Sequence, residues 1–434
     1  MKILIVSELL DPQNNIGAVR TFNFSVGLAN SGHKVFCVAS ESEKDSKISE
    51  ENNNVRVCYV EYGKLGKKRN NYVVQGGSTS GKVTKKPRKH SKIVSLIRRT
   101  LAQTWIMLKE FEWKKKALVE CSQIIENESI DVVLSSYGPI SNLLLGICIK
   151  KKYPSIVWIS DMRDPADSIH QQWPIRLYGS VLQKKMLRLA DVVTTVCDGI
   201  CEKYVHLMGE KYRNKIFVLP NGYCDSPVCY KPENDGILRV GYTGQLYKGT
   251  RDMSELFRCI KAIELKTKEK PPIQIHYAGS DAGILYKQAE PYDCQDYIVN
   301  HGKVSKSDAL KLQEQCDVLC VLTWNTKKEQ GVLTGKFPEY LRLRKPILAI
   351  VIGNLKDAEI TQRIAALNIG YSFECINETE GFGKLENWIE ECIDNKLAGK
   401  MIVKDINEGL VKQYSYDYLV NRLEKVVTNR YNED

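Results

Sequence analysis

The chain has 434 residues, of which 43% are hydrophobic and 26% are charged. This length exceeds what a single core usually supports, so we expect two globular domains of roughly 200 residues each. No stretch approaches the ~18 consecutive apolar residues of a membrane-spanning helix, which argues against an integral membrane protein.

The chain begins with MKILIVSELL, whose apolar run is short and is broken by Glu8. A single Lys precedes the run and no small-residue cleavage pattern follows it, so we interpret it as a first strand and not as a signal peptide. We therefore expect a cytoplasmic protein.

Residues 64–116 carry sixteen Lys and Arg against two acidic residues, a local charge of +14 in a chain whose net charge is +11. The first half is rich in Gly, Ser and Lys and predicts a loop. The second half has apolar residues at helical spacing, namely Ile93, Ile97, Leu101, Trp105 and Leu108. A basic amphipathic helix behind a basic loop suggests an anionic membrane surface. A helix packed on its own domain explains the pattern as well, and nucleic acid is disfavoured because nothing else resembles a module that reads it.

Short apolar runs alternate with helical stretches along the rest of the chain. In the first half these runs are KILIV, KVFCVAS, VRVCYV, DVVLSS, IVWISD, DVVTTV and IFVLP. In the second half they are LRVGYTG, IQIHYAG, YIVNHG, DVLCVLT, PILAIV and IGYSF. Buried strands separated by helices predict two parallel α/β sheets, and the Pro- and Gly-containing residues 222–236 between them predict an interdomain linker.

Ligands of open parallel sheets bind outside the carboxyl ends of the strands, so the loops that follow strands are the places to seek chemistry. The loop after LRVGYTG contains Asp252 and Glu255 at the spacing of a capping box, which predicts a helix that begins at residue 252 or 253. Lys248 and Arg251 would then lie at a helix N-terminus, where backbone N–H groups favour an anion.

The loop after DVLCVLTW reads GVLTGKFPEYL. Proline is tolerated only in the first turn of a helix, so Pro338 predicts a helix start near Gly335. Thr334 and Lys336 suit a phosphate there, and Glu339 one turn on suits the hydroxyls of a ribose or hexose. A diphosphate flanked by two sugars satisfies both features, and an ordinary helix cap with a surface Lys–Glu pair is the alternative.

A third loop, SDMRDPADS, follows IVWI in the first half of the chain. Asp161, Arg163, Asp164 and Asp167 crowd seven residues at this strand end. An Arg fixed between carboxylates preorganises a polar cleft, and a cluster that caps the following helix is the alternative. The fourteen cysteines are scattered, with no CxxC pair and no pair of His nearby, so we interpret them as reduced thiols.

Together these features resemble glycosyltransferase family 4, whose GT-B fold has two Rossmann-like domains facing a central cleft. The likeness is carried by NNIGAVRTFNFSVGLANSGHKVFCVAS, SDMRDP, LPNGY, YTGQLYKGTRD and GVLTGKFPEYLRLRKPILAI. It covers nearly the whole chain, is weakest across 64–116, and is greatest to bacterial surface-polysaccharide members. It implies an acceptor-binding domain over 1–221, the linker over 222–236, a nucleotide-sugar-binding domain over 237–412, and a helix over 413–434 that crosses back to the first domain.

The resemblance implies a retaining glycosyltransferase of hexosyl or N-acetylhexosaminyl type. The donor is expected to be a UDP-linked sugar, and the acceptor a glycan or lipid-linked molecule in lipopolysaccharide or capsule synthesis. No cofactor or metal is required in this fold, because cationic side chains and helix dipoles stabilise the leaving diphosphate. We expect peripheral attachment to the inner face of the cell membrane through residues 64–116, and no nucleic acid partner.

The resemblance implies roles for residues that match the motifs of the family. Glu339 matches a donor-contacting Glu, Lys248 or Arg251 matches the diphosphate clamp, and Gly17 matches a glycine that lets the backbone approach the donor. The expected donor-binding residues are Gly17, Gly244, Lys248, Arg251, Thr334, Gly335, Lys336 and Glu339. The candidate catalytic residues are Asp161, Arg163, Asp164, Lys248 and Glu339, with no metal ligands.

The chain also departs from the family pattern. Gly331 stands where a Glu is expected, with Glu329 nearby, and Gln245 stands where many members have an Arg. Tyr137 replaces the His of a His-x-Pro motif, so Asp161 or Asp164 would supply that polar role. Alternatively, the departing phosphate oxygen accepts the acceptor proton and no protein base is needed. A sugar-nucleotide epimerase of the same fold and a non-catalytic nucleotide-sugar-binding protein are the alternative functions.

Overall fold

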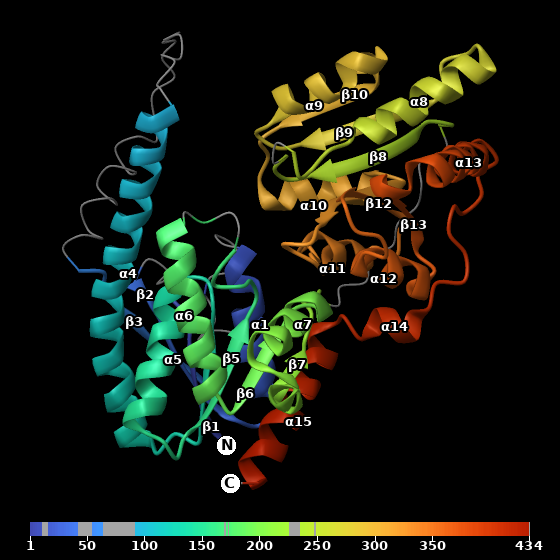
Figure 1. Ribbon diagram of the computed structural model, residues 1–434. Coiled ribbons are helices and arrows are strands. Elements are labelled where there is room, and N and C mark those ends of the chain that lie inside the picture. The colour runs from blue at the N-terminus through green and yellow to red at the C-terminus, as the bar shows by residue number, and fades with distance from the viewer. Residues whose placement is uncertain are drawn as a thin grey trace. The chain divides into compact units, whose positions relative to one another are not determined.

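The computed structural model describes residues 1–10, 16–41, 54–63, 92–168, 171, 173–224, 235–246 and 249–433, with side chains from 104 onward in the helix that begins at 92 (Figure 1). The chain forms two compact units. Unit 1 comprises Met1–Val196, Cys201–Leu219 and Val420–Asp434, and unit 2 comprises Cys197–Ile200 and Pro220–Leu419. Residues 225–234 of the predicted linker lie outside the described residues.

Unit 1 is built on a seven-stranded parallel sheet with strand order β3-β2-β1-β4-β5-β6-β7. The chain starts in the middle at β1 and proceeds outward in two directions, so the order reverses between β1 and β4. The strands are β1 (Lys2–Val6), β2 (Lys34–Ser40), β3 (Val55–Val60), β4 (Val132–Ser136), β5 (Val157–Met162), β6 (Val192–Thr195) and β7 (Ile216–Val218).

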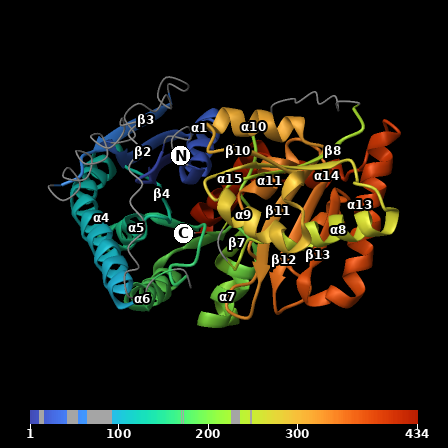
Figure 2. The ribbon, with the colours of Figure 1, turned by 90° about the horizontal axis from the view of Figure 1, so that it is seen from above.

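Helices pack on this sheet through apolar positions spaced by three or four residues. The helices are α1 (Ile16–Asn30), α4 (Lys92–Glu128), α5 (Ile140–Lys152), α6 (Trp173–Leu189), α7 (Asp198–Met208) and α15 (Tyr416–Glu433). In the long helix α4 the buried residues Trp113, Ala117, Cys121 and Ile125 recur every four residues and face the domain. Helix α5 packs against both α4 and α6, so these three helices lie side by side (Figure 2).

Unit 2 is built on a six-stranded parallel sheet with strand order β10-β9-β8-β11-β12-β13. The order reverses between β8 and β11. The strands are β8 (Leu238–Thr243), β9 (Ile273–Ala278), β10 (Ile298–Gly302), β11 (Val318–Asn325), β12 (Ile347–Gly353) and β13 (Gly370–Glu374).

Both faces of this sheet are covered by helices, as the alternation along β11 shows. Val318, Cys320 and Leu322 belong to one buried cluster, and Leu319 and Val321 belong to the cluster on the opposite face. The helices that flank the sheet are α8 (Ser254–Thr267), α9 (Ala282–Ala289), α10 (Lys306–Gln315), α11 (Lys336–Leu341), α12 (Glu359–Leu367), α13 (Glu378–Leu397) and α14 (Glu408–Lys412).

The structure confirms the predicted fold class of two Rossmann-like parallel sheets. Each of the predicted apolar runs forms a strand, and most boundaries differ by one or two residues. Every cysteine in the described part of the chain is a free thiol. Among the described helices none is both long and apolar enough to cross a bilayer. The described residues hold no group of three or more His, Cys, Asp or Glu side chains arranged for a metal ion.

Candidate functional site

The strand order of unit 2 reverses between β8 and β11, and ligands of open α/β sheets bind at this switch point. Strand β8 ends at Thr243 and is followed by Gly244, whose φ of 144° is unfavourable for residues with a Cβ. A Cβ on Gly244 would lie 3.8 Å from the Lys336 side chain. The turn after β8 therefore lies beside the first residue of α11.

Two tyrosines hold the backbone of this turn. The Tyr277 hydroxyl donates to the Gly244 carbonyl over 3.1 Å, and the Tyr242 hydroxyl donates to the Gln245 carbonyl over 2.9 Å. Their rings are stacked with centroids 6.2 Å apart. Because two carbonyls are held from inside the domain, the backbone next to Gly244 is fixed at the switch point.

A polar network joins α11 to the end of β8. One Glu339 oxygen, Oε1, accepts hydrogen bonds from Lys336 Nζ at 2.9 Å and from Gln313 Nε2 at 2.7 Å. Gln313 Nε2 also donates to Thr243 Oγ1 at 2.8 Å. Lys336 and Glu339 are 24% and 25% exposed, so solvent and a ligand can reach the pair. The structure thus brings Gly244 of the LRVGYTG motif next to Lys336 and Glu339 of the GVLTGKFPEYL motif.

The predicted start of α11 is confirmed. The helix runs from Lys336 to Leu341 with Gly335 as its N-cap, and Pro338 lies in its first turn. Next to it, Thr334 Oγ1 and Gln313 Oε1 are shielded from solvent and have no hydrogen-bond partner within the described part of the chain. A buried polar atom without a partner costs about 1–3 kcal/mol, so hydroxyls or amides of a bound ligand would relieve a cost at this site.

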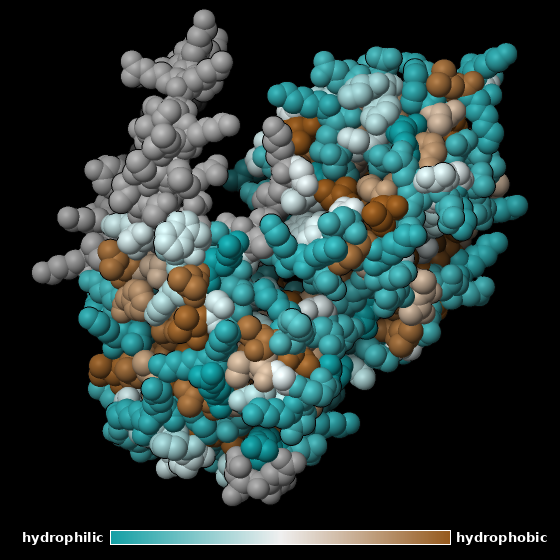
Figure 3. Space-filling model, in the orientation of Figure 1, coloured by the Kyte–Doolittle hydropathy of each residue, from teal (hydrophilic) through white to brown (hydrophobic). Residues whose placement is uncertain are grey.

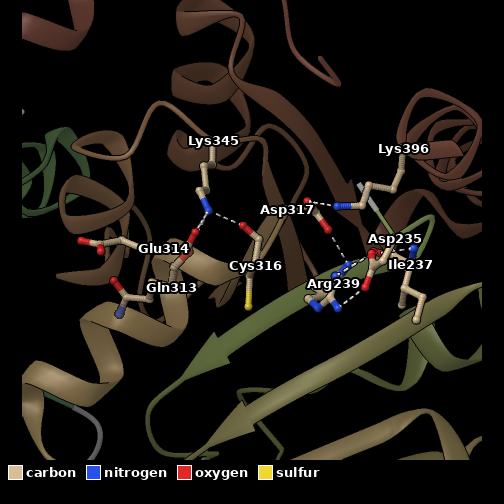
Figure 4. Close-up of polar contacts among 9 residues, drawn as sticks. All are labelled: Asp235, Ile237, Arg239, Gln313, Glu314, Cys316, Asp317, Lys345 and Lys396. Atoms are coloured by element: carbon tan, nitrogen blue, oxygen red, sulfur yellow. Dashed lines mark hydrogen bonds and ion pairs between the residues drawn. The ribbon is translucent and has the colours of Figure 1, made fainter. Parts of the chain in front are cut away.

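Gln313 was missed by the sequence analysis, because a Gln inside a helix carries no local signal of function. Its position is set by Lys345, whose ammonium group is buried and donates to the carbonyls of Gln313, Glu314 and Cys316 at the C-terminal end of α10 (Figure 4). Burial lowers the pKa of Lys345 to about 7. Figure 4 shows the Gln313 side chain directed away from Lys345, so Lys345 holds the backbone and leaves the amide for Glu339 and Thr243.

A second buried pair fixes the starts of β8 and β11. Lys396 Nζ lies 2.7 Å from Asp317 Oδ1, and the side chains are 5% and 3% exposed. The other oxygen of Asp317 accepts from the Arg239 backbone N–H at 2.8 Å, as Figure 4 shows. These contacts lie at the amino ends of the strands, so they stabilise the sheet and stand apart from the switch-point network.

The loop that follows β8 differs in part from its prediction. Helix α8 begins at Ser254, and Asp252 accepts a hydrogen bond from the Ser254 N–H at 2.8 Å. The predicted capping box is wrong, because the N-cap of the helix is Met253 and not Asp252; Glu255 instead pairs with Arg258 at 2.8 Å along the helix. Arg251 donates to the Gln245 carbonyl at 3.1 Å and so ties the loop to the turn after β8. Lys248 lies outside the described residues.

In unit 1, Asp161 at the end of β5 is 1% exposed and pairs with Arg20 of α1. Arg20 Nη2 lies 2.8 Å from Asp161 Oδ1 and Arg20 Nε lies 3.0 Å from Oδ2, while Ser136 and Thr194 donate to the same carboxylate. Burial alone would raise the pKa of Asp161, but Arg20 and these hydrogen bonds hold it below its usual value. Asp161 therefore fits a positioning role better than that of an acceptor-side base.

Arg163 donates hydrogen bonds to backbone carbonyls of neighbouring loops, and its charge also helps to lower the pKa of Asp161. It donates to Tyr137 and Gly138 at 2.9 Å each, and to Gly17 in the first turn of α1. Arg163 thus joins the loops after β4 and β5 to the start of α1, at the switch-point edge of this sheet. Asp164 is exposed at the same edge, and Asp167 pairs with Lys203 at 2.5 Å.

The switch point of unit 1 also holds two carboxyl groups that the site prediction missed. Glu8, 3% exposed after β1, accepts from the Tyr62 hydroxyl and from Ser141 Oγ. Glu110 of α4 accepts from the Ile140 N–H at 3.0 Å and thereby caps α5. Burial, followed by the nearby charge of Glu8, raises the pKa of Glu110 to about 8. The only feature of the sequence that could have indicated these carboxyl groups is Glu8 itself, because it interrupts the apolar run at the start of the chain.

Solved structures with two domains of this type cover the whole chain. A sucrose-phosphate synthase from Thermosynechococcus elongatus aligns over 100% of both chains with a TM-score of 0.64 and 12% identity. The lipopolysaccharide outer core galactosyltransferase WaaB aligns over 99% of both chains with a TM-score of 0.56 and 12% identity. The fold is GT-B.

The GT-B fold is shared by proteins of more than one activity. A protein described as a UDP-N-acetylglucosamine 2-epimerase from Listeria monocytogenes aligns over 100% of this chain and 97% of its own, with a TM-score of 0.54 and 10% identity. No family model matches the sequence, and no curated protein matches it either. At such low identities the likeness shows the fold alone, because one fold hosts many chemistries.

Proposed function

We propose that this protein is a retaining glycosyltransferase of family 4. It transfers a hexose or N-acetylhexosamine from a nucleotide diphosphate sugar, UDP-linked in our proposal, to a glycan or lipid-linked acceptor in surface polysaccharide synthesis. The observation that carries the proposal is the Glu339–Lys336–Gln313 network beside Gly244, at the switch point of a GT-B domain. Beside the turn at Gly244, this network provides the Lys336 cation and the Glu339 carboxylate. Two shielded polar atoms, Thr334 Oγ1 and Gln313 Oε1, have no hydrogen-bond partner in the described residues.

The donor fits these groups by charge and hydrogen-bonding capacity. The backbone at Gly244 allows a diphosphate to approach closely, and Lys336 supplies a positive charge next to it. Glu339 has a second carboxylate oxygen for sugar hydroxyls, while Oε1 is engaged by Lys336 and Gln313. Arg251, and Lys248 outside the described residues, would complete the diphosphate clamp. We propose that no metal or other cofactor is required, since these cations stabilise the leaving group.

In the proposed reaction the bond between the anomeric carbon and the diphosphate oxygen breaks. The acceptor oxygen forms its bond to the same face of the sugar, and the acceptor proton passes to the departing phosphate oxygen. Lys336 stabilises the negative charge that develops on the diphosphate. Because the departing phosphate oxygen takes the proton, this route needs no base from the SDMRDP loop. This is consistent with Asp161, which is buried and engaged by Arg20. Asp164, which is exposed, is then the candidate contact to the acceptor.

We further propose that the protein resides in the cytoplasm and attaches peripherally to the inner face of the membrane. The support is the charge of +14 over residues 64–116. Residues 64–91 and the side chains of 92–103 lie outside the described residues, so this part of the proposal depends on the sequence.

The test is incubation of the purified protein with radiolabelled UDP-sugars and a membrane lipid extract. We expect label in the lipid phase and release of free UDP. An altered sugar nucleotide without transfer would identify an epimerase, the second candidate, which the shared fold with the Listeria protein favours. Binding of UDP-sugars without turnover of any kind would overturn the enzymatic proposal and leave a nucleotide-sugar-binding protein.

A further inference from the structure

The solvent-exposed face of α6 carries large apolar residues that do not contribute to the core of unit 1. Trp173, Leu177 and Val181 recur every four residues and are 71%, 62% and 57% exposed. This spacing puts all three on one face of the helix. The opposite face already supplies buried residues to the core of unit 1, among them Leu182 and Met186. Single exposed apolar residues are common, but three on successive turns form a patch that needs a partner.

The charge of α6 indicates what kind of partner fits. The helix sequence WPIRLYGSVLQKKMLRL contains four Lys or Arg and no acidic residue. Lys184 and Arg188 are exposed, and their spacing from Trp173 places them on the same face as the apolar residues. We call these five residues, Trp173, Leu177, Val181, Lys184 and Arg188, the α6 patch. It is apolar near the start of the helix and cationic toward its end.

The neighbouring helix α4 extends this surface. The rings of Phe111 and Tyr178 have centroids 6.2 Å apart, so α4 reaches α6 at this level. One turn before Phe111, on the same face of α4, Leu108 is 49% exposed. Figure 3 shows hydrophobic side chains gathered over α4 and α6 on this face. The strongly basic residues 64–91 precede α4 directly in the sequence.

We infer that the α6 patch docks on the surface of a bilayer that contains anionic lipid. A Trp with aliphatic neighbours suits the boundary between headgroups and acyl chains, and Lys184 and Arg188 complement lipid phosphates. A second copy of the chain fits this patch less well. A two-fold interface would place two α6 helices, each with Lys and Arg but no acidic residue, against each other. The inference deepens the peripheral attachment in the proposed function, since a lipid-linked acceptor lies at such a surface.

The experiment is sedimentation of the full chain with vesicles of phosphatidylcholine and phosphatidylglycerol in a 3:1 ratio, and with phosphatidylcholine alone. We expect binding to the anionic vesicles that weakens as salt is raised. The variant Trp173→Ser/Leu177→Ser/Val181→Ser should lose most of this binding. The variant Lys184→Gln/Arg188→Gln should raise Kd about 25-fold, because each cation near an anionic surface contributes about 1 kcal/mol.

The matched control changes three equally exposed apolar residues of unit 2. Leu265, Leu397 and Met401 are 69%, 58% and 69% exposed, and Leu265→Ser/Leu397→Ser/Met401→Ser should bind vesicles as the wild type does. Equal loss of binding in both triple variants would overturn the inference. Because the α6 triple variant could fold poorly, the single variant Trp173→Phe is compared with the wild type by quenching of tryptophan fluorescence with spin-labelled lipid. An unchanged quench would also overturn the inference.

The outcomes separate the inference from the proposed function. If replacement of Lys85, Lys86, Arg88 and Lys89 abolishes vesicle binding while the α6 variants bind normally, the inference about α6 fails and peripheral attachment stands. If the wild type forms a dimer that the α6 triple variant cannot form, and neither binds vesicles, a second copy covers the patch and the inference fails. Vesicle binding lost with the α6 patch, in a protein without any sugar-nucleotide turnover, would support the inference and reject the enzymatic proposal.

Discussion

The two units place a carboxylate beside a cation near their switch points, but the two pairs differ in burial. In unit 1, Asp161 and Arg20 are 1% and 2% exposed, and both oxygens of Asp161 are occupied by internal donors. In unit 2, Glu339 and Lys336 are 25% and 24% exposed, with shielded polar atoms nearby that have no partner in the described residues. A closed pair holds the fold together, whereas an open pair beside unfilled hydrogen-bonding capacity is suited to a ligand.

This comparison predicts that the closed pair controls stability. Asp161→Ala leaves the Arg20 guanidinium buried without its carboxylate, which typically costs about 3–5 kcal/mol. We expect the free energy of unfolding to fall by that amount in urea denaturation. Asp394→Ala, at an exposed site of unit 2, should change it by less than about 0.5 kcal/mol. Equal stabilities of the two variants would show that the Asp161–Arg20 pair is not structural.

The open pair should instead control turnover. Loss of a charged hydrogen-bonding partner from a binding site costs on the order of 2–4 kcal/mol. Glu339→Ala should therefore lower kcat/KM for the sugar nucleotide about 30- to 1000-fold, at ~1.4 kcal/mol per tenfold. Its thermal unfolding should stay near that of the wild type. Glu380→Ala, an exposed Glu of the same unit, is the control, and wild-type kinetics for both variants would contradict the assignment of the site.

Substitution of Gln313 tests whether α10 holds the exposed Lys336–Glu339 pair in place. Gln313→Met keeps the length of the side chain but removes the donors to Glu339 and Thr243. A hydrogen bond to a charged group contributes about 1.5–3 kcal/mol, so we expect donor affinity to fall at least tenfold in calorimetric titration. Gln315→Met, on the exposed side of the same helix, should leave affinity unchanged. If both variants bind donor equally well, Glu339 does not depend on Gln313.

The last prediction concerns Glu110 and the pH dependence of unit 1. Its pKa of about 8 lies above the usual value, so the folded state retains a proton that the unfolded state has lost. A raised carboxyl pKa makes stability fall as pH rises from about 4.5 to 8, by at most about 1.4 kcal/mol per pH unit. Glu110→Gln removes this titration and keeps an acceptor for the Ile140 N–H.

We therefore expect the stability of Glu110→Gln to match the wild type near pH 4.5 and to exceed it at pH 8. Urea denaturation at several pH values measures the difference. Parallel pH profiles for the two proteins would show that Glu110 titrates normally and that its burial does not favour the neutral form.

The sequence by itself determined the strands and one helix start. Buried parallel strands read as continuous apolar runs whatever their partners are, so KILIV and DVLCVLT predicted β1 and β11 directly. Pro338 predicted the start of α11 because its ring excludes any position beyond the first turn. The Asp252–Glu255 spacing failed as a capping box, since the helix starts at Ser254 with Met253 as its N-cap, and the spacing of two polar residues does not fix the residue at which a helix begins.

Only the tertiary structure decided which charged residues meet. Arg163 stands two residues from Asp161 in the sequence, yet Arg20, 141 positions away, is the residue that pairs with Asp161. Gln313 and Glu339 likewise come from different helices, α10 and α11, and meet beside Thr243 at the carboxyl end of β8. Backbone conformation depends on neighbours in sequence, but electrostatic partners depend on neighbours in space, so the chemistry of both sites was fixed by the packing of the sheets.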